Sequence, residues 1–139
     1  MKILNTLGKV IYENKNIENM KELVEEAVKK GINLECAELE SVDLRNADLK
    51  WAKLRGAILR GTNLQGANLK WANLYGADLE GDNLEGTYLK KTILEKTNIQ
   101  GVILGADLIG AVLQYVILVD ANLRGTNLYG TGLEEDEKN

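Results

Sequence analysis

The sequence predicts an all-β solenoid, and three features of an internal repeat support this prediction. Leucine returns at every fifth position through most of the 139 residues, as in ANLKWANLYGADLEG at 67–81. A small residue, most often alanine, stands two positions before each leucine. Asp or Asn often precedes the leucine, and glycine often follows two positions after it. A short fixed period of this kind is typical of chains in which each unit packs only on its neighbours.

The five-residue period excludes the two regular alternatives. A helix turns about 100° per residue, so steps of five would scatter the leucines around its axis. A flat strand alternates its faces at every residue, so an odd step would send successive leucines to opposite faces. A chain with one corner per unit directs every central leucine inward. The predicted structural core comprises Leu49, Leu54, Leu59, Leu64, Leu69, Leu74, Leu79, Leu84 and Leu89.

The individual units match a known repeat pattern. Units 47–51, 67–71 and 121–125 have the form A(D/N)LXX, which resembles the pentapeptide-repeat family, and the resemblance covers residues 32–133. It implies a right-handed quadrilateral β-helix with four units, or 20 residues, in each coil. Trp51 and Trp71 lie 20 residues apart, as this coil length requires. Twenty-one repeat centres then give about five coils.

Three segments are expected along the chain. Residues 1–31 form an N-terminal cap, in which 2–15 contain a short strand or hairpin and 16–30 show apolar residues at helical spacing. Asn19 and Glu22 resemble a capping box, and Gly31 supplies the helix stop. Residues 32–133 form the β-helix, and 134–139 form an acidic tail. The helix is expected to cover the first coil, because solenoid ends expose unpaired strand edges.

Two departures from the repeat are apparent. Residues 102–105 form a unit of only four residues, VILG, which indicates either a tolerated deletion at a corner or a kink that shapes a binding surface. Asp82 occupies an inward position that is usually small and apolar. Because a lone buried carboxylate is costly, we expect it to accept hydrogen bonds from backbone N–H groups or from Thr62, one coil earlier.

The composition argues against an enzyme. The chain has no histidine, which removes the commonest general base and metal ligand. The single cysteine, Cys36, falls at an outward corner, where a free surface thiol is expected. Neither a metal-ligand cluster nor a phosphate-binding loop is evident, so no cofactor is expected. The absence of a signal-like start, of a long apolar run and of a cysteine pair favours a cytoplasmic protein without a membrane span.

One side of the expected rod carries a candidate interaction face. At coil spacing, a lysine column lies beside tryptophans and a further lysine, and the residues are Lys50, Trp51, Lys70, Trp71, Lys90 and Lys91. Like charges on adjacent coils repel, so stability does not explain this column. One interpretation is a binding site for an acidic protein surface or for phosphates, with the tryptophans as anchors. The alternative is a solvated lysine row whose tryptophans pack over corner methylenes.

A second candidate surface is apolar and lies in the last two coils. Ile93 and Ile103 take outward positions there, and the candidate contact residues are Ile109, Val112, Ile117 and Val119. They fall on several sides, so they either form a contact site or are covered locally. No helix is predicted after Leu133, and a homodimer through the C-terminal coil is therefore a further hypothesis.

These features favour a non-catalytic interaction or scaffold module of bacterial type, whose partner is another protein. The resemblance also suggests a DNA-mimic modulator of type II topoisomerase (gyrase) that protects against quinolones, since some relatives have this role. Such mimicry needs a strongly acidic rod, whereas residues 32–133 carry 12 acidic and 10 basic residues. The third hypothesis is weak nucleic-acid binding through the lysine and tryptophan column, which the acidic overall balance disfavours.

Overall fold

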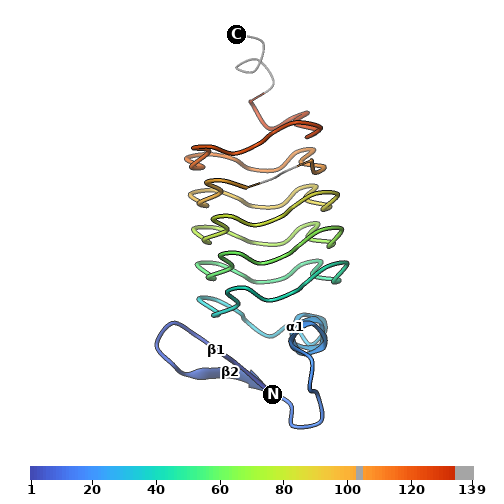
Figure 1. The fold of residues 1–139 in the computed structure, drawn as a ribbon, viewed down its shortest axis with the longest axis vertical. Helices are drawn as coiled ribbons and strands as arrows, with labels where there is room; N and C mark the ends of the chain where they lie inside the picture. Colours follow the sequence, from blue (N-terminus) through green and yellow to red (C-terminus); the bar gives the residue numbers. More distant parts are fainter. Residues whose placement is uncertain (103–104, 134–139) are drawn as a thin grey trace.

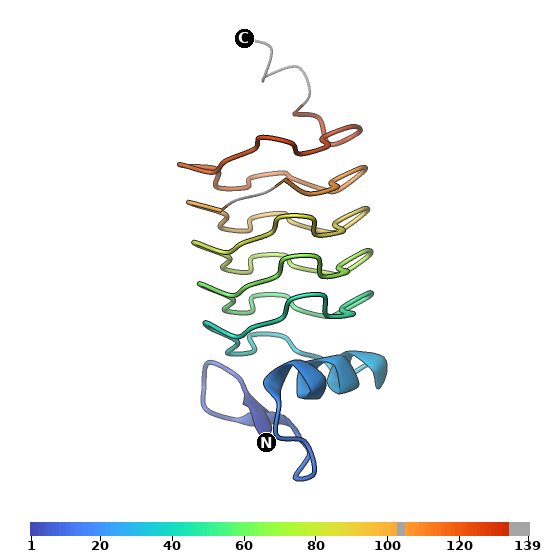
Figure 2. The same cartoon turned by 45° about the vertical axis from the view of Figure 1, so that its right-hand side comes forward.

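The computed structural model describes residues 1–102 and 105–133, and it shows a rod of stacked coils with a small N-terminal unit at one end (Figures 1 and 2). In this unit, strands β1 (Lys2–Leu4) and β2 (Val10–Glu13) pair antiparallel, and helix α1 (Met20–Lys29) follows them. Within the described ranges, no helix has the length and apolar character that crossing a bilayer requires.

Helix α1 begins at a side-chain cap and packs on the rod. The Asn19 side chain accepts a hydrogen bond from the Glu22 backbone N–H at 3.2 Å, which satisfies one of the free donors of the first turn. Glu25, a half-buried residue of the helix, accepts a hydrogen bond from the Asp48 N–H at 2.8 Å. The helix therefore lies across the first coil, as Figure 2 shows. The side chains that it buries are Leu23, Val24 and Ala27.

The coils stack in parallel register with a step of 20 residues. Asn33 pairs with Lys53, and Asp48 pairs with Asn68, in parallel bridges. Backbone N–H groups donate to carbonyls of the next coil, as from Leu49 to Asn68 at 2.8 Å. Four five-residue units therefore complete one coil, and the hydrogen bonds between coils replace those of a flat parallel sheet.

The interior is a column of leucines flanked by small residues. The nine core leucines between Leu49 and Leu89 are each 1% exposed or less. Full burial of one leucine contributes on the order of 2 kcal/mol. Threonines at the small inward positions form a repeated hydrogen bond. The hydroxyls of Thr87 and Thr92 each donate to the backbone carbonyl 23 residues earlier at 2.8 Å. Stacking of coils, rather than local preference, holds these residues together.

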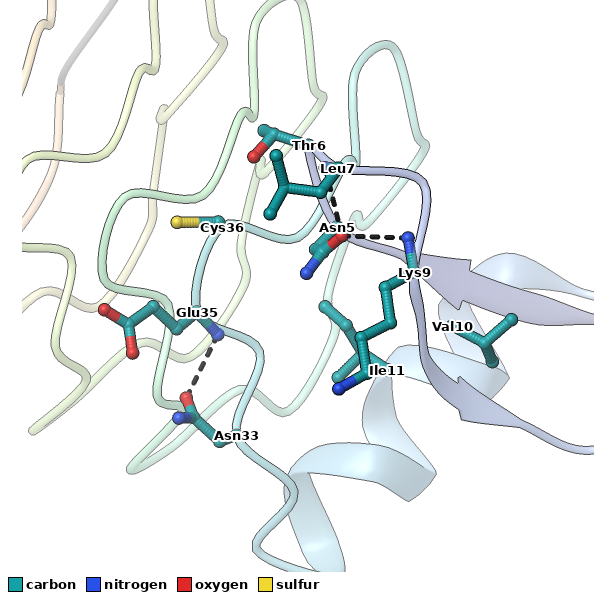
Figure 3. A pocket seen from close by; sticks show the side chains of 9 residues that line it. All are labelled: Asn5, Thr6, Leu7, Lys9, Val10, Ile11, Asn33, Glu35 and Cys36. Atoms are coloured by element: carbon teal, nitrogen blue, oxygen red, sulfur yellow. Dashed lines mark hydrogen bonds between the residues drawn. The ribbon is translucent and has the colours of Figure 1, made fainter.

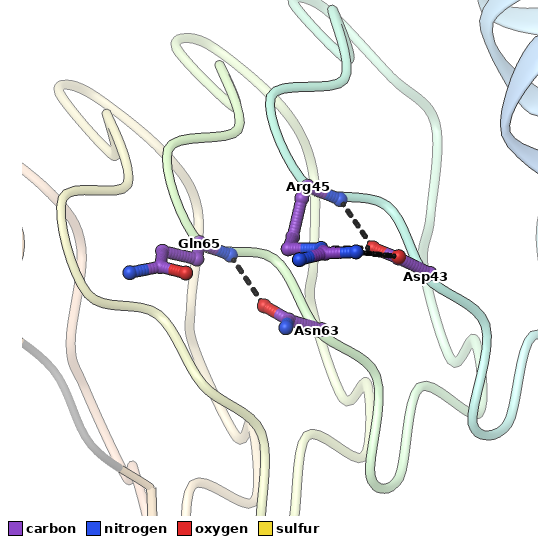
Figure 4. Close-up of polar contacts among 4 residues, drawn as sticks. All are labelled: Asp43, Arg45, Asn63 and Gln65. Carbon is purple, nitrogen blue, oxygen red and sulfur yellow. Dashed lines mark hydrogen bonds and ion pairs between the residues drawn. The ribbon is translucent and has the colours of Figure 1, made fainter.

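The corners explain the polar and glycine positions of the repeat. Asn63 accepts a hydrogen bond from the Gln65 N–H at 3.0 Å, and Asp43 does the same for Arg45 at 3.1 Å (Figure 4). Asp and Asn favour such bonds to the backbone two residues on, which is why they precede the central leucines. The second residue after each repeat centre from 34 to 99 and from 108 to 128 has a left-handed backbone, which glycine adopts at the lowest cost.

The short unit removes one residue from its coil without ending the stack. The bridges Tyr88–Asp107 and Ile93–Val112 span 19 residues, whereas Asp107–Asn127 again spans 20. The register therefore absorbs the deletion within a single coil. Residues 103 and 104 of the unit at 102–105, and the tail at 134–139, lie outside the described residues.

Candidate interaction face

The lysines and tryptophans singled out in the sequence lie on one side of the rod. The Trp51 N–H donates to the Lys70 carbonyl at 3.1 Å, and the Trp71 N–H donates to the Lys90 carbonyl at 3.2 Å. The residues therefore occupy the same place in successive coils, about 4.8 Å apart. We call this surface the Lys/Trp face, and it comprises Lys50, Trp51, Lys70, Trp71, Lys90 and Lys91.

The two tryptophans stack on each other while remaining accessible to solvent. Their ring centroids lie 5.0 Å apart with an interplanar angle of 11°. Trp51 is 58% exposed and Trp71 is 45% exposed. Both have left-handed backbones, with φ of 67° and 64°, at a corner where Gly110 stands in a later coil. A bulky residue in this conformation destabilises the fold by about 1 kcal/mol or more, so each tryptophan lowers the stability of its corner relative to glycine.

The lysines of this face are not neutralised by carboxylates. The Lys91 Nζ lies 4.9 Å from the Trp71 ring centroid, and the Lys70 Nζ lies 5.0 Å from that of Tyr88. In the described part of the chain, no carboxylate lies within ion-pair distance of Lys50, Lys70, Lys90 or Lys91. Elsewhere on the rod, arginines are paired with acids. The four lysines of the Lys/Trp face are therefore not held in ion pairs by the described residues.

A depression of about 620 Å³ borders the N-terminal end of this face. It lies between α1 and the first coils, and Trp51 forms part of its wall. The lining residues are Glu25, Val28, Lys29, Gly31, Asp48, Lys50 and Trp51. Gly31 and Val28 were not among the predicted site residues. The spacing could have indicated Gly31, because it stands 20 residues before Trp51.

Comparisons with known proteins identify the repeat. A family model described as pentapeptide repeats matches residues 30–61, 43–81, 67–105 and 106–135. The chain belongs to the pentapeptide repeat family. Solved members of this family are right-handed quadrilateral β-helices, and the 20-residue coil described above has the corresponding four sides. A search of curated proteins found no match.

Three solved pentapeptide repeat proteins are similar to this chain. One, from the thylakoid lumen of Arabidopsis thaliana, is 27% identical over 76% of this chain and 71% of its own, with a TM-score of 0.55. Another, alr5209 from Nostoc PCC 7120, is 30% identical over 75% of this chain and 91% of its own, with a TM-score of 0.55. HetL from Nostoc sp. strain PCC 7120, a protein involved in heterocyst differentiation regulation, is 33% identical over 68% of this chain, with a TM-score of 0.50. The match covers 41% of HetL.

Asp82 lies in the interior of the pentapeptide-repeat rod and not on its surface. It is 1% exposed, and its Oδ1 accepts a hydrogen bond from the Thr62 backbone N–H at 2.9 Å. Its Oδ2 is buried without a partner. Burial raises the pKa of Asp82 to about 9, the charge of Asp78 adds to the rise, and backbone hydrogen bonds from Thr62 and Gly61 oppose it. The carboxyl is therefore protonated at neutral pH.

Cys36 lies where the N-terminal hairpin meets the first coil. It is free and half-buried, and it lines a depression of about 460 Å³ between the hairpin and the first coil. Figure 3 shows the thiol pointing away from the Lys9 and Ile11 side chains, while Asn5 Oδ1 accepts hydrogen bonds from the backbone of Leu7 and Lys9. Across residues 1–102 and 105–133, no group of three or more Cys, Asp or Glu side chains is placed to hold a metal ion.

The apolar candidates of the last coils are spread over different sides. Val112 stacks on Ile93, whereas Ile117 pairs with Asn98 on the next side, where Val119 also lies. Ile109 is half-buried and follows Lys90 in the next coil, on the Lys/Trp side, where its carbonyl accepts a hydrogen bond from the Lys91 N–H at 3.0 Å. The structure therefore does not bring the four candidates into one patch, and Ile103 lies outside the described residues.

Proposed function

We propose that this chain is a non-catalytic protein-binding module, a right-handed quadrilateral β-helix of about five coils capped by α1, whose Lys/Trp face binds a partner protein. The observation that carries the proposal is the stacked pair Trp51–Trp71, which is exposed in spite of its left-handed backbone.

The stability of the rod does not account for this pair. An aromatic stack stabilises the fold by about 0.5–1.5 kcal/mol, whereas the left-handed backbones of the two tryptophans together destabilise it by about 2 kcal/mol. Glycine at these corners would avoid the backbone penalty, as it does at Gly110. Tryptophan, by contrast, is strongly enriched among the residues that dominate binding at protein interfaces. Selection for a contact therefore explains the pair better than selection for folding.

The charges favour an acidic partner. Four lysines without carboxylate partners lie beside the tryptophans, so an opposing acidic surface would gain attraction without displacing an existing ion pair. The same lysines disfavour the DNA-mimic alternative, because mimicry of a duplex needs negative charge on the exterior.

A matched pair of variants tests the proposal by affinity capture from the source cell. In Trp51→Gly/Trp71→Gly, both corners receive the residue that other coils use. The control, Tyr115→Gly, removes an aromatic side chain that is also exposed and left-handed, with φ of 58°, at a different corner. We expect the double variant to lose the captured protein and to keep its thermal stability, and the control to keep both.

Two results would contradict the proposal. The first is equal recovery of the same partner by the wild type and the double variant. The second is loss of the β-helix in the double variant, measured by circular dichroism, which would assign the tryptophans to folding. Nuclease treatment before capture distinguishes a protein partner from one held through nucleic acid.

A further inference from the structure

The indole of Trp51 has one covered face and one free face. Trp71 stacks on the first, with the ring centroids 5.0 Å apart, and Lys91 covers the far side of Trp71. On the other side of Trp51 lies the depression that Gly31 also lines; Gly31 follows the end of α1, and its N–H donates to the Val28 carbonyl at 2.9 Å. A Cβ added at Gly31 would meet nothing within 4 Å. The stack therefore ends at Trp51 because the next position has no side chain.

The space beyond the free indole face is a depression that opens to solvent, which we call the slot. The depression of about 620 Å³ described above begins at Trp51 and Gly31 and reaches Val28 and Lys29 of α1. The hydrogen bond from the Asp48 N–H to Glu25 fixes α1 against the first coil at this place. A ring placed in the slot would continue the stack and contact the apolar Val28 side chain. Aromatic rings favour such offset stacking, and pockets of a few hundred Å³ are typical ligand sites.

The lysine column leads away from this slot. Lys50 lines it, and Lys70 and Lys90 follow at steps of about 4.8 Å, so the three rows span about 10 Å. An extended peptide covers this distance in about three residues. A ligand that uses both features would carry a ring at one end and negative charges within about five residues of it.

We infer that the slot beside Trp51 binds the aromatic side chain of an acidic segment in the partner protein, while carboxylates of that segment lie on Lys50, Lys70 and Lys90. This inference rests on the proposed function, because it specifies what the Lys/Trp face recognises. The ring supplies the anchor, and the charges set the direction of the segment along the rod.

The surroundings favour a peptide over a nucleic acid strand. Glu25 and Asp48 line the slot, so the phosphate next to a stacked base would lie close to two carboxylates. The chain carries a net charge of −4, which opposes the approach of a long polyanion. A short segment with a neutral ring in the slot places no charge between Glu25 and Asp48, and its few carboxylates face the lysine column instead.

The tryptophan fluorescence of the full chain reports directly on this site, because Trp51 and Trp71 are its two tryptophans. The probe is a synthetic peptide of about ten residues with one phenylalanine followed by alternating glutamate and glycine, and the second probe replaces the phenylalanine by alanine. Phenylalanine does not interfere with indole emission. We expect saturable quenching or a spectral shift with the first peptide, and affinity lower by about tenfold or more with the second.

Two variants separate the slot from the lysine column. Gly31→Asn fills the slot with a side chain that tolerates a left-handed backbone and leaves both tryptophans in place. Gly76→Asn is its control, since Gly76 is another left-handed corner with open space around the Cβ position. We expect Gly31→Asn to weaken binding of the phenylalanine peptide by about tenfold and Gly76→Asn to leave it unchanged. The double variant Lys70→Glu/Lys90→Glu is expected to lower the affinity of the protein for both peptides.

The outcomes separate this inference from the proposed function. Equal affinity for both peptides that is lost in Lys70→Glu/Lys90→Glu would overturn the aromatic slot while supporting the face as a binding surface. Binding unaffected by Gly31→Asn, or no binding up to about 1 mM peptide, would also overturn the slot. Tighter binding of an oligothymidylate than of the peptide, lost in Gly31→Asn, would assign the slot to a base instead. The proposed function fails separately, if capture of the cellular partner does not depend on the tryptophans.

Discussion

Replacing Asp82 by asparagine is expected to stabilise the protein at neutral pH and to remove most of the pH dependence of its stability above about pH 5. In the rod, threonines at equivalent inward positions donate to carbonyls 23 residues earlier. The corresponding carbonyl for Asp82 belongs to Leu59. Asparagine has nearly the shape of a protonated aspartic acid and supplies both an acceptor for the Thr62 N–H and a donor for this carbonyl, but it does not ionise.

The magnitude follows from the two pKa values of Asp82. Its ordinary value is 3.8, and burial raises the folded value to about 9. Between these values the unfolded chain loses the proton while the folded chain keeps it, so the free energy of unfolding falls by about 1.4 kcal/mol for each pH unit. Below the ordinary pKa the contribution is complete, and above the folded pKa no further loss occurs. Between about pH 5 and pH 8 the loss is on the order of 4 kcal/mol.

The assay is urea unfolding of the wild type and of Asp82→Asn, followed by circular dichroism at several pH values in this range. The chain has no histidine, so few other groups change their charge there. We expect the difference in unfolding free energy between the two proteins to widen steadily as the pH rises. Two parallel stability curves would show that Asp82 is ionised in the folded state, and the reasoning from its burial would then be wrong.

Further predictions concern the core, the helix cap and the surface. Leu69→Ala should cost about 2–5 kcal/mol in urea unfolding, because the cavity lies between two stacked coils that cannot collapse; an unchanged midpoint would mean that Leu69 is not enclosed. Asn19→Ala should cost about 1 kcal/mol through loss of the cap on α1, and Asn19→Ser, which retains a capping oxygen, should restore most of it. Trp51→Gly/Trp71→Gly should change the stability by no more than about 1 kcal/mol, since relief at the corners offsets the lost stack; a larger loss in thermal unfolding would contradict this balance.

The short period of the repeat made the core predictable. A five-residue unit with one corner leaves few options for its central residue, so the inward place of Leu69 follows from its spacing alone. The same logic accounts for the Asp and Asn positions, because their bonds to the backbone are formed within two residues. The family resemblance added the four-sided coil, from which the alignment of Trp51 with Trp71 follows.

The surface required more than spacing. The sequence placed Lys50 and Trp51 on one side, but it did not show that the two indoles stack or that the lysines have no acidic neighbours. Side chains on the exterior choose among several rotamers and partners, and no packing constraint selects one in advance. The apolar candidates show the same limit, since Ile109 and Val119 have the same position in their units but lie on different sides.

The sequence by itself determined the repeating interior, because each inward residue is specified by contacts with identical neighbours one coil away. Only the tertiary structure decided how the N-terminal helix meets the first coil, and this contact creates the slot beside Trp51. The slot joins residues of α1 to a corner in a different segment, so its position depends on the docking of two dissimilar elements. The raised pKa of Asp82 has the same origin, since only the closed rod removes water from its carboxyl.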